Sequence, residues 1–371
     1  MRTTIPICIV AVMSKQIGIP AALGLALLSA VFVLCWSSGF LVAAVDVGAP
    51  VATLLLWRFA VVVAVLAVVV AALRRRRVGA RRAARGAGDE GHGHSVDVDS
   101  DSDDDDSDDD DGDGDDGDGD DGGRGAPARP ERARQALVGL FSQVGYVVPV
   151  YLAIGLGVST GTTALIDAVQ PLVVATLVGP LLGLRVRGAQ WAGLAVGAVG
   201  VVLVVGADLG SGTAPWTAYL LPLAAMASLV AGTFVERRHP TSSGVLDTLL
   251  VHAVVALLAI GAFAVLAGQA VPPTTATFWW TVVFVALSPT LAAYGLYWYL
   301  VGRLGITALN ALLFCVAPTT AVAGALLFDE VVTAGTLAGL VLCAAGVGVV
   351  LTSEARGRRA ARSLASVSPA T

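Results

Sequence analysis

Ten long runs of mostly apolar residues divide this chain, and they constrain its fold more than any other feature. A helix needs about 20 such residues to cross the hydrocarbon core of a bilayer. With 56% hydrophobic and 14% charged residues, the chain is far more apolar than a soluble domain. We therefore predict an all-α integral membrane protein with ten transmembrane helices. The predicted spans are 21–43, 50–73, 135–156, 159–182, 188–206, 214–235, 246–268, 277–300, 305–328 and 332–352.

The basic residues predict the orientation of these spans. If the N-terminus is cytoplasmic, every one of the 23 Lys and Arg residues except Arg58 falls in a cytoplasmic loop or tail. The outer loops carry acidic residues such as Asp46 and no basic ones. Cytoplasmic loops of membrane proteins are enriched in Lys and Arg. We therefore expect a multi-pass protein of the cell membrane with both termini in the cytoplasm, and with Met1 or Met13 as its start.

Spans five and ten repeat each other in sequence. Residues 191–201 align without a gap on residues 337–347. The aligned pairs include Gly193 with Gly339, Gly200 with Gly346 and, after a slip of one residue, Pro171 with Pro318. A repeat of five spans crosses the membrane an odd number of times, so its second copy must be inverted. We predict two inverted five-helix repeats, an architecture that many secondary transporters share.

A long hydrophilic insertion separates spans two and three. Residues 89–121 hold 19 of the 28 acidic residues and no Lys or Arg, so this stretch cannot bury a core and should be disordered. A single lysine, Lys15, beside so many aspartates suggests a salt-loving source. The predicted divisions are 1–73 with spans one and two, the disordered cytoplasmic insertion 74–134, 135–206 with spans three to five, 213–352 with spans six to ten, and the cytoplasmic tail 353–371.

Several short motifs are placed as in one transporter family. Residues 36–40, WSSGF, are similar to its W-G-x-x-F segment, and Pro50 with residues 57–59, WRF, is similar to its P…R-F pattern. In the second half, the pattern P…G…E…G is matched by Pro318, Gly324, Glu330 and Gly339. On these residues the chain resembles the EamA-like transporters of the drug/metabolite transporter superfamily.

The resemblance covers nearly all of the chain outside the insertion and the tail. It implies two EamA-like repeats of five spans, and a carrier of small solutes that is often an exporter of amino acids, metabolites or drugs. Two features depart from the family pattern. Ser37 stands where glycine is usual, and Gly183-Leu184-Arg185 stands where a glutamate usually precedes span five.

Two charged residues fall inside predicted spans. Arg58 lies eight residues past Pro50, and Asp167 lies eight past Ser159. Both spans run inward from the outer face, so both residues should lie at about the same depth. A charge near mid-membrane costs at least ~2.5–3.5 kcal/mol and needs a partner or a function. Two interpretations remain open: a static ion pair between the two, or a solute or proton site that uses at least one of them.

Polar and aromatic side chains on other spans extend this candidate site. Thr163 and Gln170 share a helical face with Asp167. Gln143 and Tyr146 lie three residues apart in span three, and Asn310 lies in span nine. Trp36 and Tyr294 supply aromatic walls. The candidate substrate-binding residues are Arg58, Asp167, Gln170, Thr163, Gln143, Tyr146, Asn310, Trp36 and Tyr294. The alternative for each uncharged polar residue is an interhelical hydrogen bond, worth about 0.6 kcal/mol.

Glu330 and two pairs of glycines have structural interpretations. Glu330 lies at the outer end of a hairpin, where we expect it to cap the N-terminus of span ten because the helix dipole favours a carboxylate there. Gly193-x-x-x-Gly197 and Gly335-x-x-x-Gly339 are predicted to let helices pack closely.

The function that these features predict is secondary transport by alternating access, with export of a small metabolite, amino acid or drug. The chain lacks a Walker A sequence, so ATP does not drive it directly. A divalent-cation transporter, suggested by the His92 and Asp-rich insertion, and a non-transport membrane sensor are the alternatives. We expect no enzyme activity, no cofactor and no metal site. The expected partners are a small solute and membrane lipids, without nucleic acid, and the oligomeric state is open.

Overall fold

The computed structural model describes residues 21–89, 129–178, 188–238 and 244–367, and every regular element in these ranges is a helix. In chain order the elements are α2 (Ala21–Ala43), α3 (Val51–Asp89), α4 (Arg129–Gly139), η1 (Leu140–Val144), α5 (Gly145–Gly155), α6 (Thr160–Ala168), α7 (Gln170–Val173), η2 (Val174–Val178), α9 (Gly188–Ser211), η3 (Trp216–Tyr219), α10 (Leu220–Arg238), α11 (Val245–Leu266), α12 (Ala276–Val285), η4 (Ala286–Ala292), α13 (Ala293–Phe314), α14 (Val316–Phe328) and α15 (Ala334–Val367).

Eight helical stretches in the described ranges are long and apolar enough to cross a membrane. They coincide with all predicted spans except the fourth and the tenth. The chain is therefore an all-helical protein of the multi-pass membrane type. Many large apolar side chains face outward from the bundle, among them Leu266, Leu326 and Val202. Such an apolar surface suits lipid and not water.

The two remaining predicted spans are helical but shorter. Span four is divided into α6, α7 and η2, and its predicted end at 179–182 lies outside the described residues. In span ten the apolar part is the stretch Ala334–Val349, although α15 itself continues to Val367. The described residues of the predicted spans are thus mainly helical, and eight helical stretches have the length and composition of a span.

Spans four and nine are both interrupted shortly before a proline. In span four the helix breaks at Val169, ahead of Pro171, and in span nine it breaks at Cys315, ahead of Pro318. A proline has no N–H to donate to the carbonyl four residues earlier, so it weakens the helix there. The predicted boundary between spans eight and nine, at residues 301–304, instead lies inside α13.

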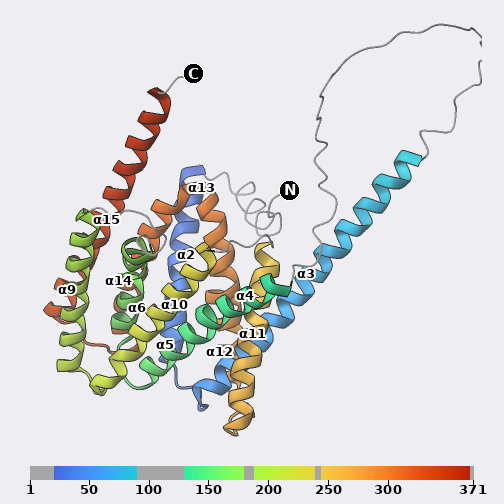
Figure 1. Ribbon diagram of the computed structural model, residues 1–371. Coiled ribbons are helices and arrows are strands. Elements are labelled where there is room, and N and C mark those ends of the chain that lie inside the picture. Colours follow the sequence, from blue (N-terminus) through green and yellow to red (C-terminus); the bar gives the residue numbers. More distant parts are fainter. Residues whose placement is uncertain (1–20, 90–128, 179–187, 239–243, 368–371) are drawn as a thin grey trace, which may run out of the picture.

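The α9–α15 pair makes the most extensive helix contact in the bundle, and Figure 1 shows these helices side by side at one edge. They touch through glycines. A Cβ on Gly200 would lie 2.8 Å from the carbonyl oxygen of Gly339, and a Cβ on Gly346 would lie 2.6 Å from that of Gly193. These positions have no room for a side chain. Of the glycines predicted to allow close packing, Gly339 does so in this contact, where its Cβ would lie 2.6 Å from the carbonyl oxygen of Gly200, and Gly197 packs closely against Leu172 of α7.

The opposite edge of the bundle is formed by α3 and α11, and the first part of the insertion continues from α3 (Figure 1). The predicted disorder over 74–134 differs from the structure at both ends, because α3 runs to Asp89 and α4 begins at Arg129. Alanine and arginine dominate these ends, and both are strong helix formers. The acidic residues 90–128 lie outside the described part of the chain.

Candidate functional site

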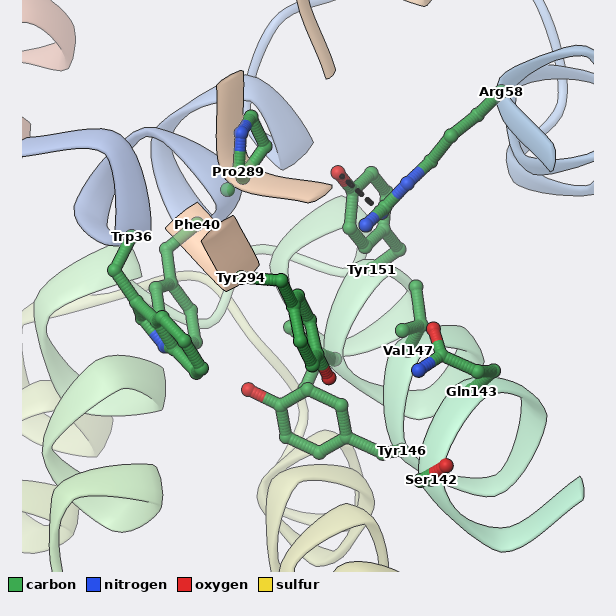
Figure 2. Close-up of a pocket in the computed structure, with 12 residues that line it drawn as sticks. Trp36, Phe40, Arg58, Ser142, Gln143, Tyr146, Val147, Tyr151, Pro289 and Tyr294 are labelled. Atoms are coloured by element: carbon green, nitrogen blue, oxygen red, sulfur yellow. Dashed lines mark hydrogen bonds between the residues drawn. The ribbon is translucent and has the colours of Figure 1, made fainter. Parts of the chain in front are cut away.

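A cavity of about 60 Å³ lies inside the bundle between α2, α3, η1, α5, η4 and α13. A buried water needs at least ~10–15 Å³ of such space, so the cavity has room for water or a small solute group. Its walls are made by Trp36, Gly39, Phe40, Arg58, Ser142, Gln143, Tyr146, Val147, Val150, Tyr151, Pro289 and Tyr294. Figure 2 shows Trp36 and Phe40 on one side, Gln143 and Val147 on the other, and the ring of Tyr294 between them.

Arg58 is the charged residue of this cavity, and its side chain is only 6% exposed. It lies seven residues after Val51, about 10 Å along α3, which is well inside a membrane span. Its Nε and Nη2 donate to Thr290 Oγ1 at 3.2 and 2.9 Å, and its Nη1 donates to Tyr151 Oη at 3.2 Å. Thr290 in turn donates to the carbonyl of Val285 at 2.8 Å, which fixes its hydroxyl as an acceptor for the arginine.

The ion pair between Arg58 and Asp167, one of the two interpretations above, is not formed. Both residues lie in the described ranges, and Arg58 directs its guanidinium to the hydroxyls of Tyr151 and Thr290 instead. These hydroxyls satisfy the arginine as hydrogen-bond acceptors, but they do not neutralise it. Among the described residues this buried positive charge therefore has no acidic partner, and its guanidinium lies 5.4 and 5.6 Å from the rings of Phe59 and Tyr151.

Asp167 lies close to the cavity without lining it. Its side chain lies near that of Tyr146, which lines the cavity and also lies near Arg58. The Oδ1 atom of Asp167 is buried and has no hydrogen-bond partner. A buried carboxylate oxygen without a donor is costly, so this group is suited to binding a proton or a polar solute group.

Aromatic rings from two distant segments form the apolar side of the cavity. The Trp36 ring lies 5.8 Å from the ring of Tyr294 and 6.3 Å from that of Tyr297. The Tyr294 side chain lies near that of Gln143 in the cavity wall. Rings of this kind offer flat apolar surface for a bound solute.

Two π-helical turns shape the polar side of the cavity. The turn Leu140–Val144 carries Ser142 and Gln143, and the turn Ala286–Ala292 carries Pro289 and Thr290. Such turns inside α-helices occur frequently at functional sites. Gly39 packs against Pro289, where an added Cβ would lie 3.2 Å from the proline ring. Because of the wide π-helical turns and the contact between Gly39 and Pro289, side chains of α2 and η4 line the same cavity.

Of the nine candidate residues predicted from the sequence, the cavity wall includes five, and Asp167 lies beside it. The five are Trp36, Arg58, Gln143, Tyr146 and Tyr294. Thr163 donates to the carbonyl of Ser159 at 3.0 Å in its own helix, so its hydroxyl is directed to the backbone. Gln170 and Asn310 do not line the cavity.

Sequence reasoning missed Tyr151 and Thr290, the two residues that hold Arg58. A signal for Tyr151 exists, because it lies eight residues after Gln143, a spacing that brings two residues to the same side of a helix. Thr290 has no comparable signal. Its contact with Arg58 depends on the π-helical turn around Pro289.

Glu330 does not cap the helix for which it was predicted. Its carboxylate accepts from the backbone N–H and the hydroxyl of Thr160 at 2.7 and 3.0 Å, so it binds the N-terminus of α6. The N-terminus of α15 is capped instead by Thr333, whose hydroxyl accepts from the N–H of Thr336 at 3.2 Å. Asp208 also reaches α6 and accepts from the N–H of Ser159 at 3.1 Å. Two carboxylates from distant segments thus stabilise one helix start.

Within the described ranges, no three His, Cys, Asp or Glu side chains come together in a way that could hold a metal ion. The cysteines described, Cys35, Cys315 and Cys343, are free thiols.

Comparison with solved structures finds a similar fold in a protein described only as "Crystal structure of protein". It matches with a TM-score of 0.51 and 19% sequence identity, over 88% of this chain and 96% of the other. At this identity the match shows a shared fold and nothing about function. No protein-family model matches the chain. No curated protein matches it.

Proposed function

We propose that the chain is a secondary transporter of a small solute, built from ten membrane spans in two inverted repeats and working by alternating access. The observation that carries this proposal is the cavity inside the bundle, which holds a buried arginine without an acidic partner beside a buried carboxyl. Charged groups at membrane depth are costly and typically mark the path of a substrate or an ion.

The glycine contacts between α9 and α15 support the inverted repeat. In the sequence alignment Gly193 corresponds to Gly339, and Gly200 corresponds to Gly346. Exchanging the two repeats therefore turns the contact between Gly193 and Gly346 into the contact between Gly339 and Gly200. The structure contains both contacts. A pair of contacts that exchange in this way is expected where two inverted copies meet along a two-fold axis.

The interrupted helices support the same proposal. The breaks at Val169 and Cys315 precede Pro171 and Pro318, which are aligned positions of the two repeats. Discontinuous helices in matching positions of two halves are typical of transporters, where they lie near the binding site. Asp167 lies just before the first break, close to Tyr146 in the cavity wall.

The motifs that resemble the EamA-like transporters favour this family and export as the direction of transport. The distribution of Lys and Arg over the loops favours a cytoplasmic location of both termini. Among the alternatives, a divalent-cation transporter requires clustered carboxylate or imidazole ligands. The described residues do not provide such a cluster. No feature of the described structure favours a sensor over a carrier.

Metabolite profiling of the medium tests this proposal. Deletion, wild-type and overexpressing cells of the source organism are compared, together with cells that overexpress Arg58→Gln. We expect the external level of at least one small solute to rise with the wild-type protein, to fall on deletion and not to rise with the variant. If no external or internal solute level follows expression of the wild-type chain, the proposal of an exporter is wrong.

A further inference from the structure

We propose that the solute carried by this site is a small carboxylate, bound through Arg58. This inference deepens the proposed transport function, on which it rests for its biological meaning. The binding itself requires only the residues of the cavity.

First, Arg58 has N–H donors that the described residues do not use. A guanidinium has five N–H donors. Three of them bond Thr290 and Tyr151, so one N–H on each terminal nitrogen has no partner among the described residues. Two donors on neighbouring nitrogens match the two oxygens of a carboxylate, which arginine binds in a bidentate manner.

The second step is the charge of the site. Arg58 is 6% exposed, lines the cavity and forms no ion pair with Asp167, although both residues are described. Tyr151 and Thr290 hold the guanidinium in place with neutral oxygens. A buried cation that is hydrogen-bonded but not neutralised gains from an anion in the adjacent space.

The third step is the rest of the cavity wall, which suits an organic anion better than an inorganic one. Trp36, Phe40, Tyr294 and Val147 surround the space and offer rings and methyl groups (Figure 2). Such walls bind an apolar body through its surface, whereas a fully hydrated ion gains nothing from them. A volume of about 60 Å³ suits a solute of few heavy atoms in this conformation.

Acetate and acetamide provide a matched pair of probes, since they have the same number of heavy atoms and nearly the same shape but differ in charge. Their binding to the purified full-length protein in detergent is measured by saturation-transfer NMR, at constant ionic strength with sodium chloride as the replaced salt. We expect acetate to bind about tenfold more tightly than acetamide, because hydrogen bonds to a charged acceptor are stronger. Arg58→Gln should abolish this preference, and Arg58→Lys should retain part of it.

Three results would overturn the inference. Equal binding of acetate and acetamide by the wild-type protein would remove the charge preference, and this comparison does not depend on the folding of any variant. An acetate preference that persists in a folded Arg58→Gln variant would place the anion elsewhere. Displacement of acetate by chloride at equal concentration would assign the site to inorganic anions. Because the assay measures binding alone, acetate binding without any solute transport would contradict the transporter and leave the carboxylate site standing.

Discussion

Replacing Gly200 by alanine places a methyl group where α15 leaves no room. The added Cβ would lie 2.6 Å from Cys343 Sγ, 2.8 Å from the carbonyl oxygen of Gly339 and 2.9 Å from the N of Cys343. Two of these atoms belong to the backbone, so the helices must separate to accept the methyl group. Gly206 is the matched control, because it lies in the same helix and a Cβ there would meet no atom within 4 Å.

The magnitude follows from two opposing terms. Alanine is favoured over glycine in a helix by roughly 0.5–1 kcal/mol, and both variants gain this amount. Overpacking costs about 1–3 kcal/mol, and only Gly200→Ala incurs it. The difference in unfolding free energy between the variants is therefore about 1–3 kcal/mol. Gly346→Ala, at the aligned position of the other repeat, should cost a similar amount, because its Cβ would lie 2.6 Å from the carbonyl oxygen of Gly193.

Reversible unfolding in mixed detergent and SDS micelles, followed by circular dichroism, measures these free energies. Gly206→Ala should be neutral or slightly stabilising, and the other two variants should be destabilised by similar amounts. If Gly200→Ala and Gly206→Ala unfold within about 0.5 kcal/mol of each other, α9 and α15 do not pack as described.

Two further perturbations test the polar contacts. Glu330→Ala removes the acceptor for the N–H and hydroxyl of Thr160, so the same unfolding assay should show a loss of about 2–3 kcal/mol in unfolding free energy. Asp329→Gly is the control. Asp329 is the neighbouring exposed residue and has a φ of 55°, which glycine adopts readily, so this change should affect stability little. Equal effects of the two changes would mean that the Glu330 contact does not stabilise the fold. Asp167→Asn keeps the size of the side chain that lies near Tyr146 and Tyr294 but removes its ability to carry a proton, so proton-driven transport in vesicles should be lost while solute exchange continues. Unchanged transport at every pH would exclude Asp167 from coupling.

The spans could be predicted from the sequence because their signal is local. A run of apolar residues of sufficient length forms a helix in lipid, since its backbone groups must bond internally. The close approach of α9 and α15 was also predictable from glycines four residues apart. The end of span eight was not predictable in the same way, because α13 continues past Arg303. The guanidinium of Arg303 lies over the ring of Tyr299, one turn earlier in this helix.

The site could be predicted only in part, because its contacts join distant segments. Arg58 could be predicted as a site residue because it is a charge in an apolar span. Its partners Tyr151 and Thr290 could not, because they lie 93 and 232 residues further along the chain. Their positions in the spans predicted that Arg58 and Asp167 lie at the same depth, but not in which direction each side chain points. In the structure, Arg58 bonds the hydroxyls of Tyr151 and Thr290 instead of the carboxylate. Glu330 likewise reaches Thr160, which lies 170 residues away in sequence, and no local pattern encodes that contact.

Access to the cavity from the two faces of the membrane tests the proposed mechanism most directly. Ser142 lines the cavity and its buried hydroxyl has no hydrogen-bond partner, so Ser142→Cys in a cysteine-free background introduces a small reporter there. Ala153→Cys, at a fully buried residue outside the cavity wall, is the control. A membrane-impermeant thiol reagent is applied to right-side-out and to inside-out vesicles. Alternating access predicts that the cysteine at position 142 reacts from both faces while the control reacts from neither. Reaction from one face only, or from neither, would contradict it.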